Sequence, residues 1–341
     1  MSTSQQTQTE IPPHAQLVQM ASAYWVSKII YAAAKLDLAD RLAAGAMSAE
    51  ELAAPTGTHA PSLHRLMRTL ASLGVLTEVE EQRFELTPFG QALRKGAPGS
   101  AHASVLTLAG PTFVGAIEQI MHSLRTGNTG FDAAYGMPVF DYFAQHPDEA
   151  SLFSETMIGI HGGETPAVAA AYDFSGLETI VDVGGATGNM LSAILSRHEN
   201  PRGVLFDMPH VVGDAPAFLE MNGVADRVTI ESGSFFESVP AGGDAYILSH
   251  IIHDWNEDQC LTILGNCRKA MKPDSRLLIV EFVLPPGDTP HPGKILDIVM
   301  LVVPGGMERT AAEYEKLLAK AGFRMTRVIP TESPVSIVKA V

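Results

Sequence analysis

The chain has 341 residues, which is long enough for two domains that each bury an apolar core. Its formal net charge is −15 at pH 7, which argues against nucleic acid or an anionic membrane as its main partner. The two cysteines, Cys260 and Cys267, exclude a disulfide framework and a cysteine-based metal quartet, so we expect a reducing compartment and no bound metal.

The N-terminal segment, residues 1–13, is rich in Ser, Thr and Gln, and we expect it to be a disordered tail. It lacks the basic region and the apolar core of a signal peptide. Nowhere does the chain approach the run of about 20 apolar residues that a membrane-spanning helix requires. These features predict a cytoplasmic protein that is not inserted in a membrane.

Residues 14–100 are predicted to form a helical first domain. Between residues 14 and 44, apolar side chains recur at helical spacing and charges are few. These side chains are Leu17, Met20, Ala21, Tyr24, Trp25, Ile29, Ala33 and Leu36. A helix that is apolar on most sides must be buried or paired, so we expect it to form the interface of a homodimer.

A winged-helix pattern follows in the same domain. Ser48 stands before two glutamates, as at the start of a helix, and a second helix is predicted over 60–73 with Pro61 in its first turn. Gly74 ends that helix, and residues 75–78 and 83–86 are predicted to form two short strands.

Winged helices can bind DNA, and His64, Arg65 and Arg68 of the second helix could face a groove. However, the first hundred residues hold 8 Lys and Arg against 9 Asp and Glu, whereas a DNA-binding module should be strongly basic. We therefore favour a dimerisation and substrate-lid module, with a ligand-responsive regulator as the alternative.

Residues 101–172 are predicted to be a mostly helical linker that contributes to a substrate pocket, with a loop over 127–136 and a helix that starts near Pro138. Met and aromatic side chains are frequent there. Such side chains are usually core, but they also suit an adaptable pocket for a flat ring. The candidates for substrate contact are Phe140, Met157 and His161, together with Met300 farther along the chain.

Residues 173–341 alternate strands and helices. Strands are predicted over 179–183, 203–207, 228–231, 244–248, 276–281, 324–327 and 335–339. Helices are predicted near 190–195, 211–221, 258–271 and 310–321. The pattern predicts an α/β fold with a seven-stranded, doubly wound, Rossmann-like sheet. A short connection joins the last two strands, so we expect them to be antiparallel.

A glycine-rich turn follows the first of these strands, with Gly184, Gly185 and Gly188 ahead of a helix. Such a turn lets a ligand approach the backbone closely, and α/β proteins bind nucleotide-like ligands there. The pyrophosphate-binding pattern G-x-G-x-x-G does not fit, because the positions that need glycine hold Ala186 and Asn189.

An acidic residue at the end of the next strand supports a nucleoside ligand. Asp207 follows the turn by about 20 residues, where a carboxylate suits a ribose diol. The alternative is that Asp207 only caps the helix that follows.

The glycine turn resembles motif I of the methyltransferases that depend on S-adenosylmethionine (SAM). Asp182, Gly184 and Gly188 occupy the motif's acidic and glycine positions, and Ala186 stands in place of its middle glycine.

A second segment makes the resemblance more specific. Ile251-Ile252-His253-Asp254-Trp255 resembles a signature of the small-molecule O-methyltransferases of the caffeic acid and hydroxyindole (acetylserotonin) type. Residues 280–285 and 305–310 agree with this family in order and spacing. The resemblance covers essentially the whole chain and includes a winged-helix dimerisation domain at its front.

The resemblance implies a catalytic group. His253 matches the general base that takes the proton from a hydroxyl. Glu281 and Glu308 match the two carboxylates that bracket this imidazole, and Asp254 follows it as in the family.

The resemblance also implies a site for SAM, which leaves as S-adenosylhomocysteine, and no metal. The positions assigned to this site are Asp182, Gly184, Gly185, Asp207, Met208, Gly233, Ser234, Phe235 and Ser249. Ser234 stands where many members have Asp, and Ser249 stands where plant members have Lys. Since serine still forms a hydrogen bond, we expect SAM to bind with rearranged contacts.

A phenol with a pKa near about 10 is mostly protonated at neutral pH, so its methylation benefits from a positioned base such as histidine. We therefore expect a homodimeric, SAM-dependent O-methyltransferase that acts on a hydroxyl of a small aromatic metabolite. The alternatives are N- or C-methylation, or a SAM-assisted reaction without methyl transfer, on the same fold. A winged-helix regulator is the alternative from another class.

Overall fold

The computed structural model describes residues 11–341, so most of the predicted disordered tail lies outside the described residues. The chain divides into two compact units. The first contains residues up to 114 together with 151–159, and the second contains 115–150 together with 160–341. The segment 101–172, treated above as one linker, is therefore shared between the units. Within residues 11–341, every helix is too short or too polar to cross a membrane.

The first unit is mainly helical. Its helices are α1 (Pro13–Ser22), α2 (Tyr24–Lys35), α3 (Leu38–Arg41), α4 (Ala49–Thr56), α5 (Ala60–Ser72) and α6 (His102–Leu108). Its strands β1 (Met47–Ser48), β2 (Leu76–Glu80) and β3 (Arg83–Leu86) form an antiparallel sheet in the order β1-β3-β2. The chain passes between the units within α7 (Pro111–Ile117) and α11 (Pro147–His161).

The predicted winged-helix elements are present. Ser48 caps α4 with a full capping box, and Pro61 lies in the first turn of α5. The long helix expected over 14–44 is instead broken into pieces, because Asp37 adopts the left-handed conformation (φ 53°) and ends the second of them.

The second unit holds a large sheet and the remaining helices. The helices are α8 (Ile120–Thr126), α9 (Gly130–Tyr135), α10 (Val139–Gln145), α12 (Glu164–Ala171), α13 (Asn189–Arg197), α14 (Ala215–Met221), α15 (Glu257–Ala270), α16 (Pro292–Val302) and α17 (Ala311–Lys320). The strands of the sheet are β4 (Thr179–Val183), β5 (Arg202–Asp207), β6 (Val228–Ser232), β7 (Ala245–Ser249), β8 (Arg276–Glu281), β11 (Met325–Pro330) and β12 (Ser336–Ala340). Two short strands, β9 (Val283–Leu284) and β10 (Arg309–Thr310), pair in parallel beside it.

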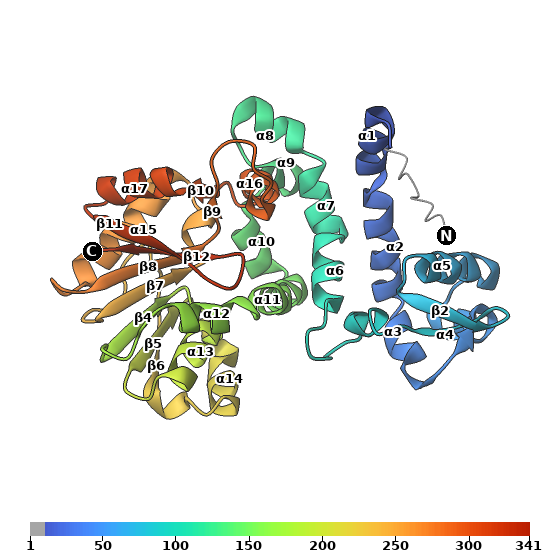
Figure 1. The fold of residues 1–341 in the computed structure, drawn as a ribbon, viewed down its shortest axis with the longest axis horizontal. Coiled ribbons are helices and arrows are strands. Elements are labelled where there is room, and N and C mark those ends of the chain that lie inside the picture. Colours follow the sequence, from blue (N-terminus) through green and yellow to red (C-terminus); the bar gives the residue numbers. More distant parts are fainter. Residues whose placement is uncertain (1–10) are drawn as a thin grey trace, which may run out of the picture. The chain divides into compact units, whose positions relative to one another are not determined.

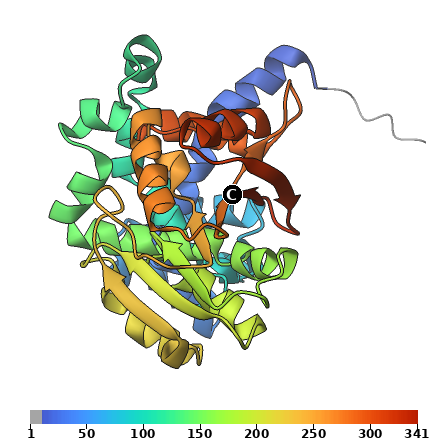
Figure 2. The ribbon, with the colours of Figure 1, turned by 90° about the vertical axis from the view of Figure 1, so that its left-hand side faces the viewer.

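The predicted seven-stranded sheet is confirmed, with the strand order β11-β12-β8-β7-β4-β5-β6. Strands β4 to β8 run parallel, and β12 is antiparallel to both β8 and β11, as expected for the last pair. The dark red strands β11 and β12 form one side of this twisted sheet, and the yellow β6 forms the other edge (Figure 2).

Helices cover both faces of the sheet (Figure 1). Successive strand residues point to opposite faces, so Ile180 belongs to the core shared with α12, α13 and α14, while Val181 belongs to the core shared with α15 and α17. Burial on both faces explains why these strands are continuous apolar runs rather than alternating ones.

Two local predictions were wrong or incomplete. The loop expected over 127–136 contains α9, which Thr129 caps and which buries Phe131 completely. Gly130, one of the glycines that suggested a loop, is needed because a Cβ there would lie 2.8 Å from the carbonyl oxygen of Ala116. The helix α16 was not anticipated.

Candidate active site

Polar residues gather where the strand order reverses. Strands β4 and β7 are neighbours in the sheet. The strand that follows β4 in the chain, β5, lies on one side of this pair, and the strand that follows β7, β8, lies on the other. The carboxyl ends of two such strands border a crevice in open α/β sheets. The glycine turn follows β4, His253 follows β7, and Glu281 ends β8.

The turn after β4 is fixed by backbone geometry. Gly184 has φ 76°, and a Cβ there would lie 2.3 Å from Cδ1 of Ile251. The backbone N–H groups of Gly184 and Gly185 both donate to the carbonyl oxygen of Phe206. Ala186 also adopts a left-handed conformation (φ 48°), which explains why related motifs place glycine at this position.

Asp207 is held as a hydrogen-bond acceptor at the tip of β5. Its Oδ2 accepts from the N–H of Ala186 at 2.9 Å, and its Oδ1 accepts from the N–H of Met208 at 2.7 Å. The next helical turn begins only at Val212, so Asp207 is not a helix cap. Burial raises the pKa of its carboxyl above the usual range. Each oxygen keeps a second lone pair, so the carboxylate fits a ribose diol of SAM.

Asp182 is buried in contact with Gly185 of the turn and is not exposed at its surface. It is 1% exposed, and a Cβ on Gly185 would lie 2.6 Å from its Cγ. Burial, and then the charge of Asp207, raise the pKa of Asp182 to about 7.

Three of the other residues assigned to the cofactor site follow β6. The N–H of Gly233 donates to the carbonyl oxygen of Asp207, and Oγ of Ser234 accepts from the N–H of Phe236 at 3.3 Å. The ring of Phe235 makes an edge contact with Trp255 at 5.9 Å between centroids. Met208 is 39% exposed beside Asp207, and Ser249 is the last residue of β7.

His253 is buried in a short 3₁₀ turn, and its ring is oriented by a carboxylate. Its Nδ1 lies 2.6 Å from Oε1 of Glu308, so the Nδ1–H donates to that oxygen. Its other nitrogen, Nε2, lies 3.6 Å from Oδ1 of Asp254. This arrangement fixes the tautomer and leaves Nε2 as the nitrogen that can take up a proton.

Glu281 contacts His253 through the backbone, and its charge also raises the pKa of the imidazole. Its Oε1 accepts from the backbone N–H of His253 at 3.1 Å, and the hydroxyl of Tyr314 donates to its Oε2. Glu281 therefore positions the turn that carries His253.

No pattern in the sequence marks the residues that hold Glu281, Glu308 and the turn of His253 in place. The backbone N–H of Glu308 donates to Oδ1 of Asp297 at 2.8 Å, and buried Arg309 donates to the carbonyl oxygen of Ile252 at 3.1 Å. Both Tyr314 and Asp297 lie on helices, α17 and α16, with no local pattern that marks them.

The carboxyl groups strongly affect the charge of His253. Burial alone would lower the pKa of the imidazole, but the charge of Asp254 and then the hydrogen bond to Glu308 raise it to about 10. Burial raises the pKa of Asp254 to about 6. His253 is therefore an unusually strong base for its residue type.

The four candidates for substrate contact lie on the helices α10, α11 and α16. Phe140 is 37% exposed, and its ring lies 5.3 Å from that of Trp255. Met300 is buried in α16, and Met157 belongs to the first unit. His161 ends α11 and bonds to Glu164.

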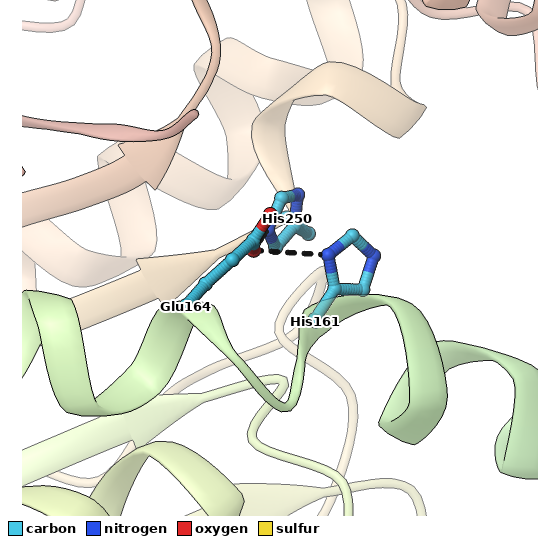
Figure 3. Close-up of side chains that lie close together, drawn as sticks. All are labelled: His161, Glu164 and His250. Carbon is cyan, nitrogen blue, oxygen red and sulfur yellow. Dashed lines mark hydrogen bonds and ion pairs between the residues drawn. The ribbon is translucent and has the colours of Figure 1, made fainter. Parts of the chain in front are cut away.

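His161, Glu164 and His250 form a cluster that the sequence did not indicate (Figure 3). Their donor atoms lie within 4.8 Å of one another, which invites comparison with a metal site. However, the centroids of the two imidazoles are only 3.7 Å apart, with the ring planes tilted by 30°. Zn–N bonds of about 2.0–2.1 Å at a tetrahedral angle would place them about 5 Å apart, so the rings would have to separate to ligate one ion.

Comparisons with protein families agree with this geometry. The family model described as the O-methyltransferase domain matches residues 118–324, and the model of the O-methyltransferase dimerisation domain matches residues 18–96.

Individual relatives match over nearly the full length. The phenazine O-methyltransferase PhzM of Lysobacter antibioticus is 44% identical over 97% of this chain and 96% of its own. An 8-amino-8-demethylriboflavin N,N-dimethyltransferase of Streptomyces davaonensis is 36% identical over 89% of this chain and 88% of its own.

This chain is also similar to a solved structure that contains ligands, namely an O-methyltransferase (NcsB1) from neocarzinostatin biosynthesis in complex with SAM and 2-hydroxy-5-methyl naphthoic acid. It is 32% identical, covers 93% of this chain and 95% of its own, and has a TM-score of 0.82. The chain belongs to the O-methyltransferase family, and it carries both the catalytic and the dimerisation domain of that family.

Proposed function

We propose that this protein transfers the methyl group of SAM to a hydroxyl of a small aromatic metabolite, with Nε2 of His253 as the general base. The observation that carries the proposal is the buried imidazole whose Nδ1–H is committed to Glu308 at 2.6 Å, because only Nε2 is then left to take a proton.

The glycine turn and Asp207 are proposed to hold SAM. Gly184 brings the backbone close to the ligand, and the Asp207 carboxylate accepts hydrogen bonds from the ribose hydroxyls. Bound SAM supplies an electrophilic methyl group on a sulfonium sulfur. Asp182 is buried against the turn, and Ser234 and Ser249 supply polar contacts at the carboxyl ends of β6 and β7.

His253 is proposed to take the proton of the acceptor hydroxyl as the oxygen becomes a nucleophile. Glu308 keeps the ring in the required tautomer and stabilises the imidazolium that forms. Asp254, whose carboxyl lies 3.6 Å from Nε2, adds to the basicity of the ring. Exclusion of water and alignment of the reacting atoms supply the rest of the acceleration, and this route needs no metal.

An aromatic acceptor is supported by the side chains near the base and by the relatives. Phe140, Trp255 and Phe236 place aromatic rings beside this segment. Two of the proteins named above are a phenazine O-methyltransferase and an O-methyltransferase bound to a naphthoic acid.

The active form is proposed to be a cytoplasmic homodimer. The matched dimerisation domain and the exposed apolar residues of α1 and α2 support the dimer. Two free, buried cysteines are consistent with a reducing compartment.

Two variants separate cofactor binding from chemistry. His253→Asn retains a donor near the Nδ1 position for Glu308 but removes Nε2. It should bind SAM with the wild-type affinity in calorimetry and lose about 10²–10⁴-fold in kcat toward phenolic acceptors. Asp207→Asn should weaken SAM binding. Full activity of His253→Asn would refute the role of this base, and absence of SAM binding by the wild type would refute the proposed function.

N-methylation is the second candidate, because one relative is an N,N-dimethyltransferase. An aminophenol offers both an amine nitrogen and a hydroxyl oxygen as methyl acceptors, so mass spectrometry and NMR of the product show which atom is methylated. Methylation at oxygen is the expected result.

A further inference from the structure

The cluster of His161, Glu164 and His250 is not used by the mechanism above. Glu164 begins α12 and is only 7% exposed. Its Oε2 lies 2.7 Å from Nε2 of His250 and 3.0 Å from Nδ1 of His161 (Figure 3). A buried carboxylate thus holds two imidazoles that come from separate parts of the chain.

The protonation states in this cluster follow from its contacts. Burial alone would raise the pKa of Glu164, but the hydrogen bonds from His161 and then His250 lower it to about 2. An ionised carboxylate only accepts hydrogen bonds, so Nε2 of His250 carries the hydrogen of that bond. Burial lowers the pKa of His250 to about 3, so its ring is neutral. Nδ1 of His250 is therefore a lone-pair acceptor.

This acceptor has no partner within the described residues 11–341. Nδ1 of His250 is buried and forms no hydrogen bond there. Buried polar atoms in folded proteins are almost always hydrogen-bonded, so an unused buried acceptor calls for an explanation, and a donor on a bound ligand is one.

The acceptor lies beside the catalytic base. His250 directly follows β7, and the centroid of its ring is 5.3 Å from that of His253. Its backbone is held in the left-handed conformation (φ 54°), which for a non-glycine residue is sustained only by its surroundings. A centroid separation of 5.3 Å is within the span of one aromatic ring or of two fused rings.

We propose that Nδ1 of His250 accepts a hydrogen bond from a second O–H or N–H group of the methyl acceptor. The enzyme then prefers aromatic acceptors that carry such a donor on the same ring as the reacting hydroxyl, or on a ring fused to it. Glu164 and His161 are positioning residues, because they fix the tautomer and the orientation of His250. The inference rests on the proposed function and specifies its substrate class.

Two probes differ only in the second donor, namely 2,3-dihydroxynaphthalene and 2-naphthol. Their binding is measured by calorimetry in the presence of S-adenosylhomocysteine, and their methylation as kcat/KM. The wild type should favour the dihydroxy probe by about tenfold, the effect of one hydrogen bond.

Two substitutions at the same position act as matched variants. In His250→Gln the amide nitrogen takes the place of Nε2 and preserves the bond to Glu164, but the Nδ1 acceptor is lost. This variant should lose the preference, so the ratio of kcat/KM between the two probes should fall to about one. His250→Asn keeps a polar atom near the Nδ1 position and should retain part of the preference.

The inference would be overturned if the wild type bound and methylated the two probes equally well. It would also be overturned if His250→Gln lowered kcat/KM for both probes by the same factor. Methylation of both probes without preference overturns the inference alone and leaves the proposed function intact. A preference in binding that disappears in His250→Gln, but without methyl transfer by the wild type, supports the recognition role and refutes the proposed function.

Discussion

The imidazole of His253 lies among three carboxyl groups with separate tasks. Glu308 bonds to the ring, Glu281 bonds to the backbone that carries it, and Asp254 lies near its free nitrogen. Together they raise the pKa of His253 to about 10, which is close to the pKa of about 10 of a phenol. Transfer of the proton between the two is then nearly balanced in free energy, but at neutral pH only a small fraction of the imidazole is deprotonated and able to act as the base.

The raised pKa predicts an alkaline pH profile. The deprotonated imidazole is the active form, so kcat/KM should rise with pH beyond the ordinary histidine value of 6.5 and level off only toward about 10. The measurement is the methyl-transfer rate from pH 6 to about 10 with one acceptor.

A matched variant tests how much the negative charge of Glu308 contributes to this pH profile. Glu308→Gln still accepts the Nδ1–H bond but lacks the charge, so its rising limb should move to lower pH. A wild-type profile that levels off near 6.5 would contradict the assigned electrostatics.

Among the elements, the loop between α16 and β10 contacts both the backbone and the ring of His253. The N–H of Met307 donates to the carbonyl oxygen of His253 at 2.9 Å. Gly306 passes so close that a Cβ would lie 1.9 Å from the same oxygen. The next residues of the loop place Glu308 against the ring.

Gly306→Ala should therefore damage both stability and activity. The added methyl group meets backbone atoms that cannot rotate away, so the loop must shift, with a cost of about 1–3 kcal/mol. We expect a lower midpoint of thermal unfolding and a loss of methyl transfer.

Gly265→Ala is the control, because Gly265 lies inside α15 with no atom within 4 Å of the added Cβ. That helix should gain about 0.5–1 kcal/mol with unchanged activity. Wild-type behaviour of Gly306→Ala would show that the loop does not constrain the base.

At the scale of the whole molecule, the first unit presents apolar side chains that a single chain leaves exposed. Leu17 and Trp25 of α1 and α2 are 66% and 60% exposed, and Met20 and Tyr24 are similarly open. Exposed apolar surface of this kind is typical of an association surface, and the dimerisation-domain match covers residues 18–96.

The double variant Leu17→Glu/Trp25→Glu should be monomeric. Burial of two carboxylates at an apolar interface carries a desolvation free energy that opposes association of the two chains. Light scattering should give about twice the chain mass of 36.4 kDa for the wild type and the single mass for this variant. Met221→Glu, at a residue 76% exposed on α14, should remain dimeric. A wild type at the single mass would contradict the dimer.

The sequence by itself determined the elements that depend on neighbours in the chain. The apolar run 179–183 before Gly184, the cap at Ser48 and the seven-strand pattern are local, so the fold class was predictable and is confirmed. The segment around His253 was equally recognisable, because its residues are contiguous.

Which side chains meet depends on how the elements pack in the folded chain. Packing of α17 on the sheet brings Tyr314 to Glu281, 33 residues away, so that Glu281 holds the backbone rather than the ring of His253. Glu164 meets His250 across 86 residues. These contacts depend on strand order and helix packing, which no local pattern encodes, and they determine the basicity of His253 and the acceptor at His250.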